Sequence, residues 1–346
     1  MLNKKVFIDG YFLYGNHGVA NVLEVLCKEF SLNNALTIGV CKHTYFEKEI
    51  FFRSLKAKFY IYKLPGALRL IELFFICLRN KYDHYSFHYF SPLVLLNTRK
   101  VHVWVYDILY YDFKDDYSLF YRVSRTLINK ILLSKKLKII TISKYSQERI
   151  IHYFRNLDVE VIKLGLSSQF LSKPISSNIK DNQDSYILYV SRFEKRKNQL
   201  ELIKAWEDSN SKHQLILIGF EVDGYKKVCT DYCDDKGLNN VIFLQGLSSE
   251  ELKNYYIHAN KIFYLSKSEG FGLPVIEALY LNGKCFFYNN TALKEFTFAS
   301  NNFIDGIGLE GILKERDSRF KNNNYRKIID KFYNLDNNIK NYVDNI

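Results

Sequence analysis

Two glutamates on either side of a glycine-rich turn form the most chemically informative segment of this chain. Glu269 and Glu277 stand eight positions apart, with a Gly-Phe-Gly turn between them. An apolar run at 262–265 precedes the turn, and an apolar helical pattern at 275–281 follows it. The turn is therefore predicted to join the carboxyl end of a strand to a helix N-terminus. Free backbone N–H groups and the helix dipole favour a phosphate or sugar oxygen at such a position.

The chemistry of these groups suits a ligand that carries both hydroxyls and phosphates. Carboxylates accept hydrogen bonds from vicinal hydroxyls, whereas backbone amides hold a phosphate. A nucleotide sugar has both kinds of group. Taken alone, the segment is equally compatible with a tight turn in which the glycines supply only backbone freedom and Glu277 is a solvated helix residue.

A basic loop is the second chemical signal. Arg192 and Lys197 stand five positions apart, directly after an apolar run at 186–190. An arginine can hold a diphosphate bidentately and a lysine can add a point charge, which would neutralise a departing diphosphate without a metal ion. Because four of the six residues from 192 to 197 are cations, a solvated basic loop is the alternative.

The elements that must position these groups alternate between apolar strands and amphipathic helices. Strands are predicted in the first half at 6–9, 36–40, 58–62, 101–106 and 138–142. In the second half they are predicted at 186–190, 214–218, 241–244 and 262–265. This alternation predicts an α/β protein with two doubly wound, Rossmann-like domains that face each other across a cleft. Ligands of such sheets bind at the carboxyl ends of the strands.

The domain boundaries follow from composition. Residues 1–166 are expected to form the first domain and residues 185–324 the second. Between them, residues 167–184 are rich in Ser, Asn, Lys and Asp and are expected to be a linker. Residues 325–346 can form a helix that crosses back to the first domain.

Length and charge narrow the class of protein. With 346 residues, 47% of them hydrophobic, the chain is long enough for two cores. The formal net charge of +12 suits nucleic acid, an anionic membrane surface or acidic ligands. We expect no nucleic-acid partner, because the cations are spread along the chain without zinc-finger spacing, a basic arm or an RNA-binding aromatic signature.

A peripheral contact with acidic lipid headgroups fits the charge better. Apolar side chains at Phe120, Leu127, Ile131 and Leu132 are interleaved with cations in one segment. These cations are Arg122, Arg125, Lys130, Lys135, Lys136 and Lys138. An ordinary amphipathic helix with a solvated basic face is the alternative.

No targeting or metal-binding segment is evident in the sequence. Residues 1–10 read as a short strand rather than a secretory signal, so we expect a cytoplasmic protein. The apolar run at 68–78 contains two charges and falls short of the roughly 20 residues that span a bilayer. The six cysteines lack C-x-x-C spacing, and Cys229 and Cys233 have no histidine at zinc spacing, so neither disulfides nor a metal site are expected.

The two motifs together resemble the retaining glycosyltransferases of the GT-B fold, in the glycosyl transferases group 1 family. The shared sequence motifs are Ser-Arg-Phe-Glu-x-Arg-Lys-Asn-Gln, which begins at Ser191, and Glu-Gly-Phe-Gly-Leu-Pro-x-x-Glu-Ala, which begins at Glu269. The segments 243–246, 249–252 and 291–295 match as well, so the resemblance covers nearly the whole second half. It implies a nucleotide-sugar-binding second domain and an acceptor-binding first domain.

The resemblance implies a role for each charged residue of the two motifs. Glu269 would bind hydroxyls of the donor sugar, and Glu277 would hold the ribose hydroxyls of the nucleotide. Arg192 and Lys197 would bind the diphosphate. Neither glutamate need be a nucleophile, because family members are thought to use front-face attack with the departing phosphate as base.

Backbone groups would complete the donor site that the resemblance implies. Phe271, Gly272 and Leu273 would offer N–H groups to the sugar and phosphate. Contacts near Gly246 and Leu247 would bind the base. No metal ion or other cofactor is implied.

The first half matches the family more loosely. Gly18 lies in a segment similar to the family's glycine-containing loop near the donor phosphates and the acceptor. Asp107 could bind an acceptor hydroxyl or act as a base. Tyr106 stands where many relatives have histidine, so it is either a packing residue or an altered catalytic one. Ser143 is predicted to cap the next helix.

The resemblance implies a metal-independent, retaining transfer of a sugar from a nucleotide-diphosphate donor to a saccharide acceptor. The acceptor would be a lipid-linked oligosaccharide of bacterial surface polysaccharide, O-antigen or capsule, reached from the inner face of the cell membrane. GDP-mannose is favoured over UDP-sugars as donor, because the sequence of residues 192–199 resembles that of mannosyltransferases. The alternatives are a nucleotide-sugar epimerase or glycan phosphorylase of the same fold, or a module that binds sugar nucleotide without turnover.

Overall fold

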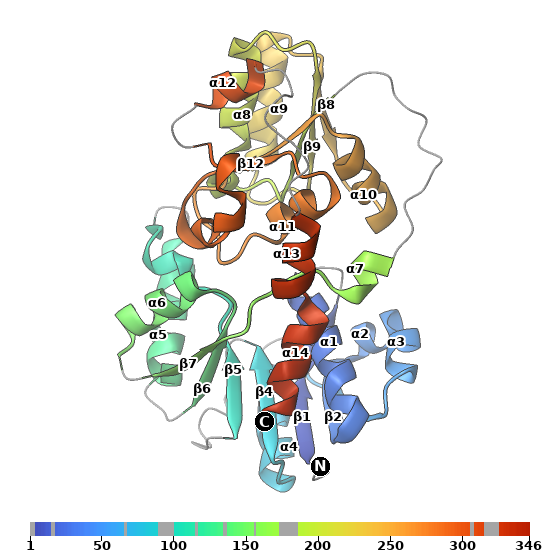
Figure 1. The fold of residues 1–346 in the computed structure, drawn as a ribbon. Helices are drawn as coiled ribbons and strands as arrows, with labels where there is room; N and C mark the ends of the chain where they lie inside the picture. The colour runs from blue at the N-terminus through green and yellow to red at the C-terminus, as the bar shows by residue number, and fades with distance from the viewer. Residues whose placement is uncertain are drawn as a thin grey trace. The chain divides into compact units, whose positions relative to one another are not determined.

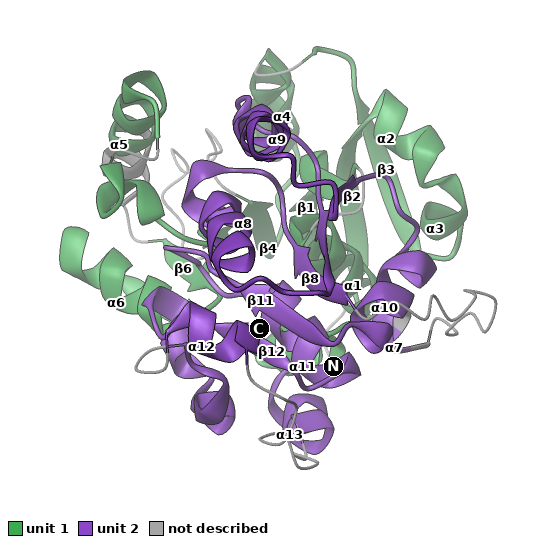
Figure 2. Ribbon diagram, turned by 90° about the horizontal axis from the view of Figure 1, so that it is seen from above, with its two compact units in different colours: residues 1–167, 334–346 green, residues 168–333 purple. Residues whose placement is uncertain are grey.

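The computed structural model describes most of the chain in two compact units. The described residues are 4–14, 18–65, 68–88, 100–114, 117–133, 137–155, 157–172, 186–304, 308–314 and 325–346. Unit 1 consists of residues 1–167 with 334–346, and unit 2 of residues 168–333 (Figure 2). Both units are built from a parallel sheet with helices on its faces (Figure 1), as the strand–helix alternation predicts.

The sheet of unit 1 has seven parallel strands in the order β3-β2-β1-β4-β5-β6-β7. The strands are β1 (Lys5–Asp9), β2 (Ala35–Cys41), β3 (Ala57–Tyr62), β4 (His84–His88), β5 (Val101–Trp104), β6 (Lys138–Thr141) and β7 (Asp158–Val161). The five strands predicted for this half are confirmed. The pattern did not predict β4 and β7, because neither contains an uninterrupted apolar run.

The helices of unit 1 cover both faces of its sheet. They are α1 (Gly18–Asn33), α2 (Lys42–Glu47), α3 (Glu49–Arg53), α4 (Arg69–Arg79), α5 (Leu119–Leu133), α6 (Lys144–Tyr153) and α14 (Leu335–Asp344). The Ser143 side chain accepts a hydrogen bond from the Ser146 N–H at 3.0 Å and caps α6, which confirms the predicted cap.

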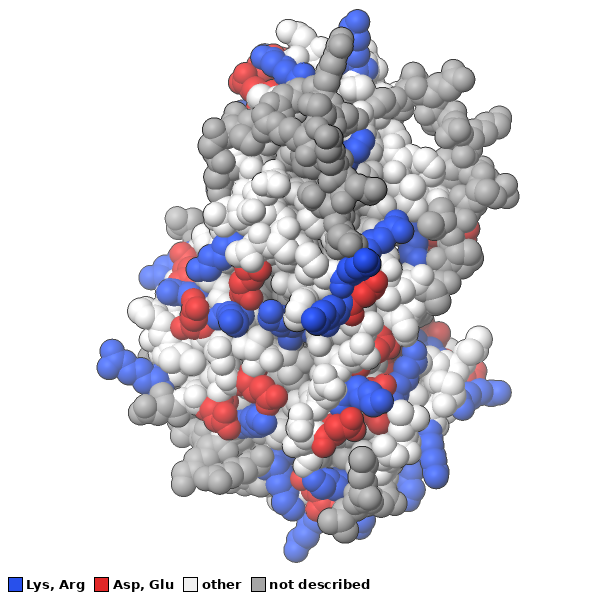
Figure 3. All heavy atoms as spheres, viewed as in Figure 1, with Lys and Arg blue, Asp and Glu red and all other residues white. Residues whose placement is uncertain are grey.

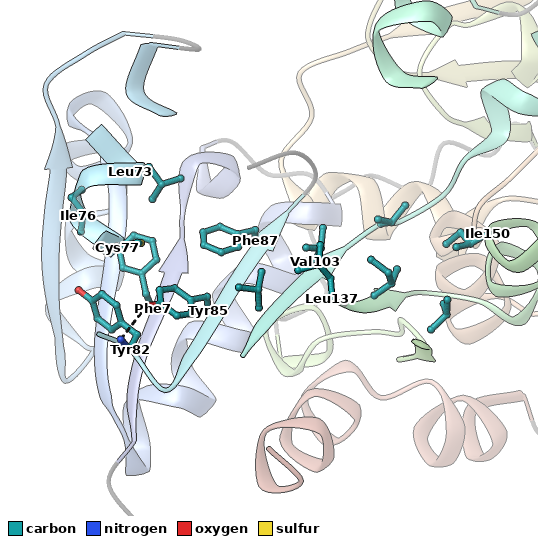
Figure 4. Close-up of a cluster of buried hydrophobic side chains, with 14 of the residues drawn as sticks. Phe7, Leu73, Ile76, Cys77, Tyr82, Tyr85, Phe87, Val103, Leu137 and Ile150 are labelled. Atoms are coloured by element: carbon teal, nitrogen blue, oxygen red, sulfur yellow. Dashed lines mark hydrogen bonds between the residues drawn. The ribbon is translucent and has the colours of Figure 1, made fainter. Parts of the chain in front are cut away.

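The two faces of this sheet differ in polarity. On one face, Phe7 and Phe87 pack with Leu73 and Cys77 of α4 in an apolar cluster (Figure 4). On the other face the strands carry His84, Ser86, His88, His102 and Trp104, all buried. The last helix, α14, covers part of this face, where its Tyr342 hydroxyl lies 2.6 Å from His102 Nδ1.

The sheet of unit 2 has five parallel strands in the order β10-β9-β8-β11-β12. The strands are β8 (Tyr186–Val190), β9 (Gln214–Ile218), β10 (Val241–Leu244), β11 (Lys261–Tyr264) and β12 (Cys285–Phe287). The helices are α7 (Ser168–Ser172), α8 (Gln199–Asp208), α9 (Tyr225–Lys236), α10 (Ser249–His258), α11 (Leu273–Leu281), α12 (Leu309–Lys314) and α13 (Tyr325–Phe332). The four predicted strands are confirmed.

The end of the chain forms two helices rather than one. α13 belongs to unit 2, whereas α14 belongs to unit 1 and packs along α1 (Figure 1). Asn334 separates them and caps α14, since its side chain accepts from the Asn337 N–H at 3.0 Å. The segment expected as a linker begins with α7, and its remainder lies outside the described residues. Within the described ranges, no helix combines the length and apolarity needed to cross a bilayer.

Candidate functional site

The turn with the two glutamates joins β11 to α11, as the sequence predicts. Gly272 has a φ of +106°, a left-handed backbone conformation that glycine tolerates best. A Cβ atom at this position would collide with the Leu293 side chain. Pro274 lies in the first turn of α11, where its missing N–H costs no helical hydrogen bond. The glycine and the proline therefore fix the sharp strand-to-helix turn.

The structure brings the two motifs into direct contact through a buried ion pair. The Lys197 ammonium donates a hydrogen bond to the Glu269 carboxylate, although the two residues are 72 positions apart in the sequence. Only 8% of the Lys197 side chain and 10% of the Glu269 side chain are exposed. The Tyr264 hydroxyl links them, accepting from Lys197 Nζ at 3.0 Å and donating to Glu269 Oε1 at 2.9 Å.

Arg196 is a second cation of this cluster, and sequence reasoning gave it no role. Its Nη1 donates to the Ser268 carbonyl at 2.8 Å and lies 3.6 Å from Glu269 Oε1. Its Nε lies 2.8 Å from Glu194 Oε2. Arg196 thus ties the basic loop to the glycine-rich turn. The sequence did contain a hint of this role, because the basic loop carries more cations than the binding of one diphosphate requires.

Opposing effects set the protonation of the buried pair. Burial disfavours the Glu269 carboxylate, but the charges of Lys197 and Arg196 outweigh it and lower the pKa of Glu269 to about 2. Burial lowers the pKa of Lys197, and Glu269 opposes this effect. Glu269 is therefore an acceptor for hydroxyl groups at neutral pH and a poor general acid.

Arg192 lies outside the buried cluster. Its side chain is 61% exposed, and its Nη2 lies 2.7 Å from Glu194 Oε1. The loop that carries it is held close to the end of β9, because a Cβ atom on Gly219 would collide with the Ser191 carbonyl oxygen. The structure therefore separates the two cations that the sequence paired: Lys197 faces Glu269, and Arg192 faces outward.

Glu277 occupies a different environment from Glu269. Its Oε2 accepts a hydrogen bond from the Tyr256 hydroxyl at 3.2 Å. Burial raises the pKa of Glu277 to about 7, while Tyr256 and Lys253 oppose the rise. Glu277 therefore changes charge near neutral pH, where Glu269 does not.

Glu277→Gln is expected to raise stability at alkaline pH. A carboxyl with a folded-state pKa of about 7, above its ordinary 4.5, favours folding at low pH and loses that contribution as the pH rises through 7. Glutamine can still accept from Tyr256 but never ionises. The variant should gain about 1–2 kcal/mol over wild type at about pH 8, and the gain should shrink at about pH 5. Urea unfolding at both pH values measures this, and an equal gain at both would contradict it.

The backbone positions predicted for the donor site follow β10 and β11 of unit 2, two strands that are separated in the sheet by β9 and β8. Gly246 and Leu247 come after β10, and Gly246 is exposed with a φ of +75°. Phe271 and Leu273 flank Gly272 after β11, and the Phe271 ring is buried 5.8 Å from that of Phe296. The loops after β8, β10 and β11 all leave the carboxyl edge of one parallel sheet.

In unit 1, the predicted residues also follow strand ends. Gly18 is the first residue of α1, and residues 15–17 lie outside the described residues. Asp107 is half-buried, and its Oδ1 accepts from the Leu109 N–H at 3.4 Å. Tyr106 is buried with its hydroxyl 2.9 Å from Nδ1 of His88, whose pKa burial lowers to about 3. Its surroundings are those of a packing residue with a neutral histidine partner.

The described residues show no group of three or more His, Cys, Asp or Glu side chains placed to hold a metal ion. The six cysteines are free thiols, and burial raises the pKa of Cys229 to about 12 and that of Cys233 to about 11. Thiols with such high pKa values are unreactive near neutral pH.

Comparison with known proteins gives one matching family model, a group of relatives similar in sequence and a group of solved structures similar in fold. Residues 173–302 match the family model described as "Glycosyl transferases group 1". The chain is 26% identical over 213 residues to O-antigen chain mannosyltransferase B of Escherichia coli, covering 56% of this chain and 55% of that one. It is 29% identical over 226 residues to O-antigen chain mannosyltransferase RfbU of Salmonella typhimurium, covering 64% and 59%. The match thus spans less than two thirds of either relative.

Solved structures share the fold over the whole chain. HepE from Anabaena in complex with UDP superimposes with a TM-score of 0.70 at 16% identity, covering 99% of both chains. WaaG, a glycosyltransferase involved in lipopolysaccharide biosynthesis, gives a TM-score of 0.65 at 11% identity, covering 98% of this chain and 95% of WaaG. The fold is GT-B, as the motifs implied.

Proposed function

We propose that this chain, which belongs to the glycosyl transferases group 1 family, moves a sugar from a nucleotide-diphosphate donor to a saccharide acceptor with retention of configuration. The contact between Lys197 and Glu269 carries the proposal, because it unites the two motifs in one buried cluster. The loops with Arg192, Gly246 and Glu269 leave the same edge of the sheet. Cations, carboxylates and the backbone N–H groups of the glycine-rich turn at that edge match the parts of a nucleotide sugar.

The proposed mechanism gives electrostatics the main part. Arg192 and the N-terminus of α11 would stabilise the negative charge of the departing diphosphate, without a metal ion. Lys197 would hold the Glu269 carboxylate toward hydroxyls of the donor sugar. Glu277 would accept from the ribose hydroxyls, and Asp107 would bind the acceptor hydroxyl.

Retention is proposed to proceed by front-face attack rather than through a covalent enzyme intermediate. A carboxylate nucleophile must be free to approach the anomeric carbon. Glu269 is instead held by Lys197, Arg196 and Tyr264. The departing phosphate would therefore take the proton of the attacking hydroxyl.

For the donor we propose GDP-mannose before UDP-sugars, and for the product a bacterial surface polysaccharide. Two relatives are O-antigen mannosyltransferases, which favours mannose. HepE was solved with UDP, so UDP-sugars are the next candidates. The acceptor would be a lipid-linked oligosaccharide at the inner face of the cell membrane, where a chain of net charge +12 would meet acidic headgroups.

Nucleotide binding and turnover test this function in two steps. A nucleotide at about 100 times its dissociation constant should add roughly 2.7 kcal/mol of stability, so thermal shifts with GDP-, UDP- and dTDP-sugars identify the donor. Addition of acceptor should then release free nucleoside diphosphate. Binding without release would leave a sugar-nucleotide-binding module, the alternative to which the buried Tyr106 points. No shift with any nucleotide would refute the donor site.

A further inference from the structure

A pocket of about 740 Å³ opens at the amino-terminal edge of the sheet of unit 1. It is lined by the first residues of β1, β2 and β3, by the end of α1 and by the end of α4. The residues that the sequence predicts near the acceptor, Gly18 and Asp107, follow the carboxyl ends of β1 and β5. They therefore lie at the opposite edge of the same parallel sheet, and the pocket is a separate feature of unit 1.

The strand register explains why this part of the sheet is hollow. Lys5 of β1 pairs with Ala35 of β2, and Lys58 of β3 pairs with Thr37 of β2. Paired residues of neighbouring parallel strands point to the same face of the sheet. Two lysines therefore stand on either side of β2, and the short side chains of Ala35 and Thr37 leave space between them.

The end of α4 supplies another wall of the pocket. Phe7, two positions after Lys5, points to the same face of the sheet and packs 5.3 Å from the ring of Tyr82. Tyr82 lines the pocket and is buried in the apolar cluster of unit 1, which holds this wall in place. Arg79 is the last residue of α4 and Lys81 follows it, and both side chains are exposed.

The lining of the pocket is strongly basic. None of the described residues that line it is acidic, whereas five are cations. In the part of the chain that the structure describes, none of these cations forms an ion pair with a carboxylate. By contrast, cations are interspersed with carboxylates on the face that Figure 3 shows. The five cations are Lys5, Lys56, Lys58, Arg79 and Lys81, all of them exposed.

The nearest acid in the sequence does not neutralise these cations. Asp83 accepts a hydrogen bond from the Lys5 backbone N–H at 3.1 Å, and its Oδ1 lies 3.6 Å from Lys100 Nζ. The C-termini of α1 and α4 also adjoin the pocket, and each helix end contributes about half a negative charge. Five cations exceed that contribution, so the pocket has a positive potential. An anion in the pocket would relieve the repulsion among the cations.

Sequence reasoning missed this pocket because its cations come from separate segments and form no run. The cations that the sequence grouped at 122–138 have other surroundings. Arg122 and Arg125 are partly buried, and Lys138 Nζ lies 2.6 Å from Glu160 Oε2. Lys135 and Lys136 lie outside the described residues.

The size and the polar groups of the pocket favour a small phosphorylated ligand. Its volume lies within the range of roughly 300–1,000 Å³ that is usual for sites of small molecules. Lysine ammonium groups and the guanidinium of Arg79 suit phosphate oxygens. The amides of Asn33 and Asn34, which also line the pocket, can both donate to and accept from hydroxyl groups.

We propose that this pocket binds a soluble small molecule that carries two phosphate groups on a hydroxylated body, the chemical class of the sugar bisphosphates. The cations would hold the phosphates, and the amides would contact the hydroxyls. This binding goes beyond the proposed sugar transfer, because none of the lining residues belongs to the predicted donor or acceptor site.

Isothermal titration of the full chain with glucose 1,6-bisphosphate tests the proposal. Wild type should bind one molecule, and more tightly than it binds glucose 1-phosphate, because a second phosphate meets further cations. Lys58→Gln and Arg79→Gln should each weaken binding about tenfold, through loss of a charged hydrogen-bond donor. Lys42→Gln is the matched control, since Lys42 is an exposed cation of unit 1 outside the lining. It should bind as wild type does.

A substitution that fills the pocket without changing its charge distinguishes a site from a diffuse positive potential. Ala35→Phe should weaken binding of glucose 1,6-bisphosphate more than tenfold, because the ring would occupy the floor of the pocket. Ala35 is exposed, so thermal unfolding without ligand should be unchanged. Binding by Ala35→Phe as tight as that of wild type would overturn the proposal.

Two further measurements locate the bound compound. Arg192→Ala should bind glucose 1,6-bisphosphate as wild type does, whereas loss of binding would place the anion in the donor site and overturn the proposal. Acetylation of lysines, followed by mass spectrometry, should show that the compound protects Lys56, Lys58 and Lys81 but not Lys42. Protection of none of these three would overturn the proposal as well.

Larger anions provide the last comparison. If vesicles of phosphatidylglycerol or a single-stranded oligonucleotide bind through Lys58 and Arg79 while glucose 1,6-bisphosphate does not bind, the proposal is wrong. Thermal shifts with nucleotide sugars on the same samples separate this test from the proposed reaction. Binding of the bisphosphate without any shift by a nucleotide sugar would refute the proposed transfer alone.

Discussion

Glu269→Gln is expected both to destabilise unit 2 and to remove most of the transfer activity. The substitution leaves the Lys197 ammonium buried beside Arg196 without its anionic partner. Breaking a buried pair on one side costs about 3–5 kcal/mol. The lost carboxylate should also lower the rate of transfer by about 10²–10³-fold, the usual effect of removing one preorganised group from an active site. Urea unfolding and nucleotide release measure the two losses.

A double substitution separates the structural role of the pair from its functional role. Lys197→Met with Glu269→Gln removes both charges and keeps the length of both side chains, so no uncompensated charge stays buried. The double variant should recover most of the stability that either single variant loses. Its transfer activity should stay low, because the acceptor for the sugar hydroxyls is still missing. Recovery of activity together with stability would show that the pair acts only as scaffold.

An exposed pair provides the control for this cycle. Lys227 and Asp231 form an ion pair on α9 at 2.7 Å, with side chains 76% and 54% exposed. Lys227→Met with Asp231→Asn should change stability by less than about 1 kcal/mol, because water screens such a pair. The contribution of the buried Lys197–Glu269 pair to stability should depend on pH. It should be fully present above about pH 4.5 and should be lost as the pH falls toward about 2, where Glu269 becomes protonated.

The fold could be predicted from the sequence wherever strands read as apolar runs. Strand β4, which the sequence pattern did not predict, has the sequence His-Tyr-Ser-Phe-His, in which polar residues alternate with aromatic ones. Two of its polar residues, Ser86 and His88, are nevertheless buried with hydrogen-bond partners from the neighbouring part of the sheet, whereas Nε2 of the buried His84 has no such partner among the described residues. Ser86 accepts from Trp104 Nε1 at 3.1 Å, and His88 meets Tyr106. Such partners are distant in sequence, so a local pattern could not reveal them.

The candidate site could be predicted as two motifs but not as one cluster. Both strand-end turns lie where the apolar runs placed them. The direct contact of Lys197 with Glu269 and the roles of Arg196 and Tyr264 depend on β8 and β11 being neighbours in the sheet. Tyr264 in particular read only as part of an apolar strand. Burial also separates Lys197 from the exposed Arg192, and spacing carries no information about burial.

Arg192→Ala is expected to leave the fold intact and to disable transfer. Its side chain is 61% exposed and its ion partner Glu194 also binds Arg196, so stability should change by no more than about 0.5 kcal/mol. If Arg192 holds the donor diphosphate, transfer should fall by about 10²–10³-fold. The transfer rate of Arg192→Lys should lie between those of wild type and Arg192→Ala, because lysine keeps the positive charge but cannot bind a phosphate bidentately as a guanidinium does.

Lys195 supplies the matched control for Arg192, because it is an exposed cation on the same loop. Lys195→Ala removes the same charge three positions away and should keep transfer within about threefold of wild type, as expected of a surface cation outside the site. Equal losses in both variants would mean that the loop contributes only a diffuse positive potential, which added salt would screen. A loss confined to Arg192 would place one defined guanidinium at the diphosphate.

That outcome would also explain why Arg192 is exposed while Lys197 is buried. Arg192 must be accessible to the donor, whereas Lys197 must hold Glu269 in place.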